Sequence, residues 1–210
     1  MMNLAKEQLR PRRGVFATAA EKKEKKGLTT VDIALAGIAN VAFGVLNTAW
    51  AYPWVFLNAS FGIVGAALLQ PFNIGPNLVA YIVRKPGIFT LSGLVMGFAN
   101  MLSGDPNGIN CIYWGLCAGL CGEIAFAILG YKKERMFAVI ALACVLQIFG
   151  TNLTTYFIYG WSETPMGLFI AGALIGILAN WVQSGLLAIW VAKALAKTGL
   201  LKRFSIGQGV

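Results

Sequence analysis

The sequence predicts an all-α integral membrane protein, a six-transmembrane-helix bundle with both termini in the cytoplasm. Of the 210 residues, 58% are hydrophobic and only 12% are charged, and the mean hydropathy is +0.70. Soluble domains average about 25% charged residues. The apolar part, residues 28–199, contains no linker, and each span needs about 20 residues. Its runs do not alternate as the strands of a β-barrel would, and the breaks between them favour six helices.

The first 27 residues form a separate polar segment that carries eight Lys and Arg against three Glu. It has no apolar stretch of the kind found in a signal peptide. We interpret 1–27 as a basic cytoplasmic tail that is disordered or lies on anionic lipid. No nucleic-acid-binding module accompanies the charge, so nucleic acid is not an expected partner. Residues 200–210 are expected to form a short C-terminal tail.

The first helix of the membrane domain is expected over residues 30–50. Thr29 and Asp32 have the spacing of a capping box, in which each side chain accepts a hydrogen bond from the other residue's backbone N–H. Aromatic residues that favour the membrane–water interface follow it and mark its end; they are Trp50, Tyr52 and Trp54.

The second and third helices are expected over 58–83 and 88–103. Proline lacks a backbone N–H and disrupts helices, so Pro71 and Pro76 predict a kink or unwound turn near mid-membrane. A tight turn at 84–87 separates the two helices.

The remaining three helices are expected over 109–130, 136–160 and 165–196. Three Gly-xxx-Gly pairs, at 93 and 97, 115 and 119, and 172 and 176, permit close approach of helix backbones.

Orientation follows from the basic residues. All 17 Lys and Arg fall on one side of a six-span arrangement, in the tail, the 84–85 turn, the 132–135 loop and the stretch from Lys193 onwards. The opposite loops contain only the acidic residues Asp105 and Glu163. Cytoplasmic loops carry the excess of Lys and Arg, so both termini are expected to be cytoplasmic.

Glu123 is a single carboxylate inside the long apolar run that begins at Trp114. A charge in the membrane centre costs about 3 kcal/mol on insertion scales, so it is expected to face the bundle interior or a cavity. Two interpretations remain open: Glu123 contacts a ligand, or it pairs with an amide of the first or second helix.

Polar side chains in several expected helices lie mostly from mid-membrane outwards. Gln147, Thr151 and Thr155 are spaced to share one helix face. The others include Asn40, Asn47, Gln70, Asn73, Asn77, Asn100, Asn152, Asn180, Gln183 and Ser184. Hydrogen bonding between helices would explain any one of them, but the whole set favours a ligand cavity.

Several kinds of chemistry lack their usual residues. The chain has four Cys, no His and no CxxC pair, so no metal site or cofactor is expected. The phosphate loop GxxxxGK[ST] and the GxSxG nucleophile motif are both absent. The sequence therefore favours a binding or transport subunit over an enzyme.

Four segments carry a family resemblance. GPNLVAYIVRKPG (75–87) and GEIAFAILGYKKER (122–135) resemble the YkoE type of S component of energy-coupling factor (ECF) transporters, as do LTTVDIALAGIANVAFGVL (28–46) and ALAKTGLL (194–201). The resemblance implies a six-helix protein of a prokaryotic plasma membrane that binds a vitamin on its outer side. It also implies a transmembrane coupling protein and two ATPase subunits as partners, with ATP hydrolysis supplied in trans. The YkoE type is associated with thiamin and its precursor hydroxymethylpyrimidine (HMP).

This resemblance turns the polar set into a predicted site. Glu123 would pair with a cationic or aminopyrimidine group of the ligand. Aromatic residues would stack on its rings or on a thiazolium; they are Tyr113, Trp114 and Trp161. Amide and hydroxyl groups would bind its polar edges; they are Gln147, Thr151, Asn152 and Asn180. Small residues of the first helix would dock the coupling protein; they are Ala36, Ala39 and Ala42.

Three alternatives remain. The chain could be an S component for a different vitamin or small aromatic precursor. It could be a structural membrane subunit in which Glu123 is an internal strut. It could also be a stand-alone secondary transporter, which would need a coupling-ion site that one buried carboxylate does not supply.

Overall fold

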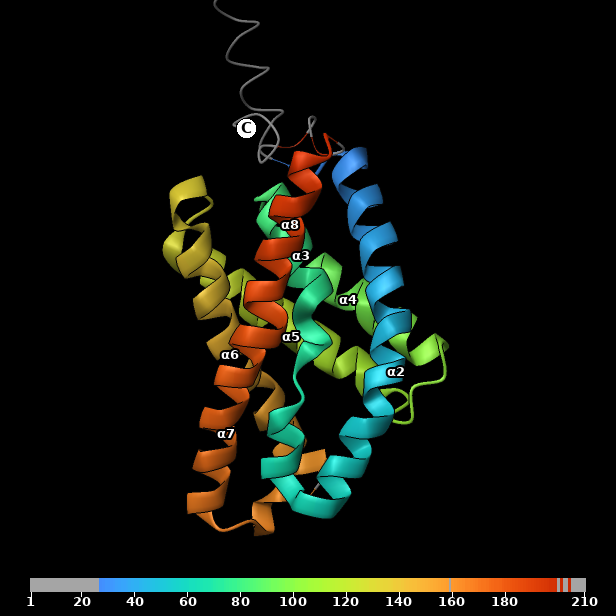
Figure 1. Ribbon diagram of the computed structural model, residues 1–210, viewed down its shortest axis with the longest axis vertical. Coiled ribbons are helices and arrows are strands. Elements are labelled where there is room, and N and C mark those ends of the chain that lie inside the picture. The colour runs from blue at the N-terminus through green and yellow to red at the C-terminus, as the bar shows by residue number, and fades with distance from the viewer. Residues whose placement is uncertain (1–26, 159, 200, 202–203, 205–210) are drawn as a thin grey trace, which may run out of the picture.

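The computed structural model describes residues 27–158, 160–199, 201 and 204, and within them all regular secondary structure is helical. Helices α2, α3, α6, α7 and α8 follow the long axis, and α4 and α5 cross behind α3 and α8 at a tilt (Figure 1). Their bounds are α2 Thr30–Leu68, α3 Ile74–Val83, α4 Ile88–Leu102, α5 Asn110–Leu129, α6 Met136–Ile158, α7 Met166–Asn180 and α8 Leu187–Lys197. Four helical segments are long and apolar enough to cross a membrane: Thr30–Leu68, Asn110–Leu129, Lys133–Ile158 and Met166–Lys197. Ile88–Leu102 is a shorter apolar helix.

The first helix is longer than the sequence predicts. α2 continues past the helix end predicted at residue 50, with Pro53 inside it, and the backbone departs from helical geometry only at Gly62, where φ is 58°. The predicted end is wrong because Tyr52 and Trp54 do not share one environment: residues two apart on a helix point to different sides. Tyr52 is exposed, whereas Trp54 is buried in a cluster with Trp161. Trp54 is therefore a packing residue rather than an interface marker.

The predicted interruption of the second helix is confirmed. After Leu68 the chain leaves helical geometry, forms a 3₁₀ turn over Pro71–Asn73 (η1), and starts α3 at Ile74. Such a break frees backbone groups that cannot remain unsatisfied inside a membrane. α3 itself is buried along almost its whole length, so the break lies beside the centre of the bundle.

Two side chains of the last helix bind the freed backbone groups. The Gln183 side chain accepts a hydrogen bond from the Gln70 N–H (2.8 Å) and donates one to the Leu68 carbonyl (2.8 Å). The Ser184 hydroxyl accepts one from the Asn73 N–H (3.2 Å) and donates one to the Gln70 carbonyl (2.6 Å).

The helix predicted over 165–196 is present but contains a π-helical turn, Trp181–Leu186 (η4), which lies between α7 and α8. Wide turns of this kind are frequently found at functional positions. Gln183 and Ser184 both lie in this turn and face the broken segment.

Ser184→Ala is expected to lower the free energy of unfolding by about 1–3 kcal/mol, because it removes the two hydrogen bonds by which Ser184 supports the break. The measurement is unfolding of the purified protein in mixed detergent micelles. Ser162→Ala, at an exposed serine of the 3₁₀ turn Trp161–Glu163 (η3), is the matched control and should change little. Equal stability of both variants would show that Ser184 does not support the break.

The close crossing of α4 and α5 confirms the prediction made from the glycine pairs. A Cβ added at Gly93 would overlap the carbonyl oxygen of Gly115, and one added at Gly115 would overlap that of Gly93. Gly97 lies as closely against the backbone at Cys111. Only glycine, which has no side chain, allows the backbones of two helices to approach each other this closely.

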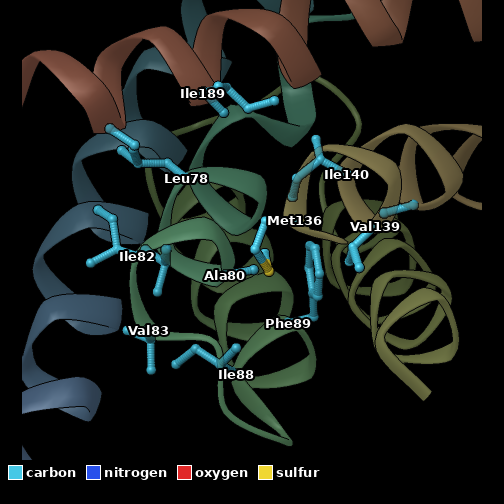
Figure 2. Close-up of a cluster of buried hydrophobic side chains, with 14 of the residues drawn as sticks. Leu78, Ala80, Ile82, Val83, Ile88, Phe89, Met136, Val139, Ile140 and Ile189 are labelled. Atoms are coloured by element: carbon cyan, nitrogen blue, oxygen red, sulfur yellow. The ribbon is translucent and has the colours of Figure 1, made fainter. Parts of the chain in front are cut away.

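The main apolar core surrounds α3. Leu78, Ile82 and Val83 of α3 pack with Phe89 of α4, and with Met136, Val139 and Ile140 of α6 and Ile189 of α8 (Figure 2). α3 is therefore the central element, and helices from both halves of the sequence cover it.

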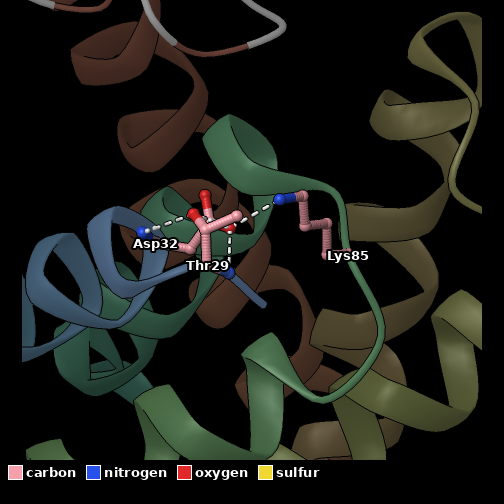
Figure 3. A network of polar contacts seen from close by, with 3 residues as sticks. All are labelled: Thr29, Asp32 and Lys85. Carbon is pink, nitrogen blue, oxygen red and sulfur yellow. Dashed lines mark hydrogen bonds and ion pairs between the residues drawn. The ribbon is translucent and has the colours of Figure 1, made fainter. Parts of the chain in front are cut away.

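The predicted capping box is present at the start of α2 (Figure 3). The Asp32 carboxylate accepts hydrogen bonds from the Thr29 N–H (2.8 Å) and from Lys85 Nζ (2.6 Å). This ion pair holds the 84–87 turn beside the first turn of α2. Leu28, Tyr131 and Leu201 pack against one cluster, so the 130–135 loop and the end of α8 lie at the same end of the bundle.

The described Lys and Arg residues all occur in these turns or in the last turns of α8. We call this the basic end. The predicted basic tail, apart from Gly27, lies outside the described residues, as does most of 200–210.

Candidate substrate-binding cavity

A cavity of about 90 Å³ lies away from the basic end. Its walls come from α2, the broken segment before α3, α4, the 103–109 loop, the first turns of α5, the second half of α6 and η3. One water needs roughly 10–15 Å³ on this scale, so the cavity has room for several water-sized groups.

Four aromatic side chains form one wall of the cavity: Trp54, Phe72, Trp114 and Trp161. The Trp54 ring meets Trp114 edge-on with a centroid separation of 5.8 Å, and it meets Phe72 at 6.5 Å. Mutual packing of this kind fixes ring orientations and leaves faces on which a flat ligand ring can stack.

Amide side chains surround this aromatic wall. Asn47 donates a hydrogen bond to the Phe72 carbonyl (3.0 Å), which ties α2 to the broken segment. Asn73 donates to Asn180 (3.2 Å), and Asn100 accepts a hydrogen bond from Thr48 (3.0 Å). These contacts hold the amides in place, and each amide has further donor and acceptor capacity for a polar ligand.

Among the described residues of the cavity wall, the acidic one is Asp105, which lies in the loop between α4 and α5 and is only 6% exposed. Its Oδ1 accepts hydrogen bonds from the backbone N–H and the side-chain amide of Asn107, both at 2.8 Å. Among the described residues that line the cavity, none is Lys or Arg.

Four of the eight predicted site residues line the cavity: Trp114, Thr151, Asn152 and Trp161. Gln147 and Asn180 lie behind the wall and are fully buried. Gln147 donates to Asn77 (3.2 Å), and Asn180 donates to the Cys144 carbonyl (3.0 Å). They support the cavity through Asn73 rather than line it. Tyr113, next to Trp114 on α5, is 56% exposed and points away.

Glu123 does not line the cavity. Its carboxylate accepts hydrogen bonds from the N–H groups of Gly87 (2.8 Å) and Phe89 (3.2 Å) at the start of α4, and from the Tyr131 hydroxyl (3.3 Å). A carboxylate at a helix N-terminus is favoured by the unpaired N–H groups and the helix dipole. Burial, and after it the Glu123 charge, raise the pKa of Tyr131, which keeps its hydroxyl protonated as a donor. These contacts favour a structural role, and we do not retain Glu123 as a ligand contact.

Glu123→Gln is expected to lower the free energy of unfolding by about 1–2 kcal/mol and to leave ligand affinity within about twofold, because the residue caps α4 away from the cavity. Ligand titration and thermal unfolding of the same preparation measure both effects. Glu134→Gln, at an exposed carboxylate in the adjacent loop, is the control. A large loss of ligand affinity without a loss of stability would show that Glu123 contacts the ligand.

The three alanines expected to dock a coupling protein do not share an exposed face. Ala36 is fully buried in the main core, Ala39 is half-buried, and Ala42 is exposed. Ala36 packs inside the bundle and is not retained as a docking residue.

Several cavity residues were not in the predicted site, and two of them belong to α2. The buried positions of α2 include Ala36, Asn40, Gly44, Asn47, Ala51 and Trp54. They repeat every three or four residues, as one face of a single helix does. Following this period past residue 50 would have placed Asn47 and Trp54 on the inner face.

The fold and the cavity define a multi-pass membrane protein of the S-component fold. The structure aligns with a crystal structure of an S component of an ECF transporter at a TM-score of 0.82 and 23% identity, over 87% of this chain and 92% of that one. Residues 31–150 match the model of the family described as the permease component of ABC-type cobalt transport systems. That match spans more than half of the chain, and the protein belongs to this family.

A curated relative agrees with this assignment. The chain is 24% identical over 181 residues to YkoE of Bacillus subtilis (strain 168), a protein provisionally named as an HMP/thiamine permease. The alignment covers 84% of this chain and 89% of YkoE. The resemblance stated from the sequence is confirmed.

Proposed function

We propose that this protein is the substrate-specific binding subunit of an ATP-driven ECF-type vitamin importer, with thiamin or HMP as its substrate. The observation that carries the proposal is the cavity, whose aromatic wall and amide lining suit a flat, polar heterocycle. The S-component fold, the permease family and the name of the Bacillus relative support it.

In this proposal the described chain crosses a prokaryotic plasma membrane six times, with residues 28–199 as one membrane domain. The first crossing is α2 up to Gly62, and the second runs from Gly62 to the end of α3. Helices α4, α5 and α6 are the next three crossings, and α7 with α8 is the sixth. The basic end faces the cytoplasm, because Lys and Arg are retained on that side. The cavity then opens towards the outside, where a nutrient is captured.

The cavity has room for at least one substituted ring, since it holds several water-sized groups. HMP is a single substituted pyrimidine, and thiamin carries the same pyrimidine joined to a thiazolium. Both are therefore compared in the test below.

The family description names cobalt, but the cavity chemistry favours an organic ligand. Sites for divalent transition metals such as cobalt(II) are built from several imidazole, thiolate or carboxylate ligands. The chain has no His, and the described part of the cavity wall offers one carboxylate, Asp105, and one thiol, Cys111. No group of three or more such residues occurs among the described residues.

In the proposed cycle the ligand is captured from outside between the aromatic wall and the amides. A transmembrane coupling protein and two ATPase subunits then drive reorientation and release. The chain has no phosphate-loop motif, so ATP hydrolysis is supplied in trans.

The test is the thermal stability of the detergent-purified protein with thiamin, HMP, other B vitamins or Co²⁺ added separately. A ligand that binds only the folded state stabilises it by RT ln(1 + [L]/Kd). A saturable shift with HMP or thiamin is expected. A shift with another vitamin alone would keep the S-component role and change the substrate, and a shift with Co²⁺ alone would overturn the vitamin assignment.

Two other results would support the alternatives. The absence of any shift in folded protein would favour a structural subunit. Ion-gradient-driven uptake by the isolated chain in liposomes would favour a secondary transporter.

A further inference from the structure

The cavity contains a buried carboxylate that the described residues leave without a counter-charge. Asp105 is 6% exposed, and its side chain accepts hydrogen bonds from the backbone N–H and side-chain amide of Asn107 and from the Cys111 thiol. All three donors are neutral. A buried carboxylate without a cation is costly, and sites of this kind are found where a charge or donor arrives with a ligand.

The loop geometry fixes where this carboxylate points. Asp105 lies between Gly104 and Gly108, which adopt φ values of 86° and 56° that favour glycine. The Gly108 N–H donates to the Asp105 carbonyl (3.0 Å), which closes the loop. The side-chain position is therefore set before a ligand enters.

The two carboxylate oxygens differ in their partners. Both hydrogen bonds from Asn107 end on Oδ1. Oδ2 receives neither of them, and the residue is part of the cavity wall. Oδ1 thus anchors the loop. A carboxylate oxygen can accept more than one hydrogen bond, so Oδ2 keeps acceptor capacity for a ligand beside the Cys111 thiol.

We propose that Asp105 is the specificity-determining residue of the cavity, and that it selects ligands with an amino or cationic group, which it binds at Oδ2 while their ring packs against the aromatic wall. This assignment rests on the proposed function. It names the protein group, the Asp105 carboxylate, that would distinguish a ligand ring with an amino group from one without. It replaces Glu123 as the carboxylate that contacts the ligand. A bond between a carboxylate and an N–H donor is stronger than one between neutral groups.

The substitution that isolates this role is Asp105→Asn. Asparagine keeps an oxygen in the position of Oδ1 and can still accept from Asn107, so the loop is retained while the charge and one acceptor are lost. Glu163→Gln is the matched control, because Glu163 is an exposed carboxylate in η3 that does not line the cavity.

The experiment compares two probes on each protein by calorimetric titration: HMP, and the same pyrimidine with its amino group replaced by hydrogen. In the unmodified protein HMP should bind about tenfold or more tightly than the analogue. Asp105→Asn should lose about tenfold or more in affinity for HMP while binding the analogue as before. Glu163→Gln should behave as the unmodified protein does.

Thermal unfolding without ligand is measured for each variant, so that a failure to fold is recognised. If Asp105→Asn does not fold, discrimination between the two probes by the unmodified protein decides the matter: equal affinities would overturn the proposal.

A folded Asp105→Asn protein that keeps full affinity for HMP, or loses affinity for both probes equally, would also overturn it. In both cases the vitamin-binding function would stand. If the unmodified protein binds neither probe nor any vitamin, the proposed function itself fails, and the assignment of Asp105 fails with it.

Discussion

Trp114→Ala is expected to weaken ligand binding by about 10- to 100-fold while the bundle stays folded. Stacking a nucleobase-like ring on an aromatic side chain is worth about 1–3 kcal/mol, and a pyrimidine is such a ring. Trp114 lines the cavity and its ring packs edge-on against Trp54 at 5.8 Å. Truncation removes both the stacking surface and the contact that orients Trp54. Calorimetric titration with HMP measures the loss.

The matched control for this substitution is Trp190→Ala. Trp190 lies on α8, is 67% exposed and takes no part in the cavity wall. It should leave affinity unchanged, whereas Trp114→Phe should recover most of the loss because it restores an aromatic face. Equal affinities in the Trp114→Ala and Trp190→Ala proteins would exclude the aromatic wall as the ligand-binding surface.

Gly93→Val is expected to destabilise the protein by about 3 kcal/mol or more and to lower the yield of folded material. A Cβ at position 93 would overlap the backbone carbonyl of Gly115 on α5, and it would lie 3.0 Å from the Cα of Gly119. Backbone atoms of a neighbouring helix cannot move aside as a flexible side chain can, so the two helices must separate. Overpacking a core usually costs about 1–3 kcal/mol, and contact with backbone lies at the upper end. Unfolding in mixed micelles gives the value.

Gly37→Ala is the control for this glycine. It also lies in a helix, but an added Cβ meets nothing within 4 Å. Its effect should stay within about 1 kcal/mol and can be stabilising, because alanine favours helix. If Gly93→Val were as stable as Gly37→Ala, the close α4–α5 crossing would be incorrect. The α4–α5 crossing also forms part of the cavity wall through Gly97 and Gly115, so ligand affinity is expected to fall with stability.

Features that depend on neighbours in the sequence could be predicted from it. The capping box at Thr29 and Asp32 is present, and the helix break occurs at Pro71, because proline has no backbone N–H to donate within a helix. The glycine pairs of α4 and α5 meet because small residues repeated every four positions leave a groove on one helix face. The basic residues mark one end of the bundle for a similar reason, since charge is excluded from the membrane interior. These effects act within one helix or between a helix and its solvent.

Long-range pairing was decided only by the tertiary structure. Glu123 and Asp105 are both carboxylates beside apolar helices, and sequence position favoured the first. The Glu123 carboxylate accepts hydrogen bonds from backbone N–H groups that lie 34 and 36 residues away in the sequence, at the start of another helix. Periodicity gives the face of a helix on which a residue lies, but not which helix end or loop will meet that face.

The same limit applied to Trp54, whose role depended on α2 continuing past residue 50 to bring its ring against Trp114. By itself, therefore, the sequence determined a helical membrane protein, its basic end, its break and its close helix crossing, because each follows from local chemistry or from the membrane. The tertiary structure alone decided which carboxylate and which aromatic rings face the cavity, because those positions are set by contacts between residues far apart in the chain.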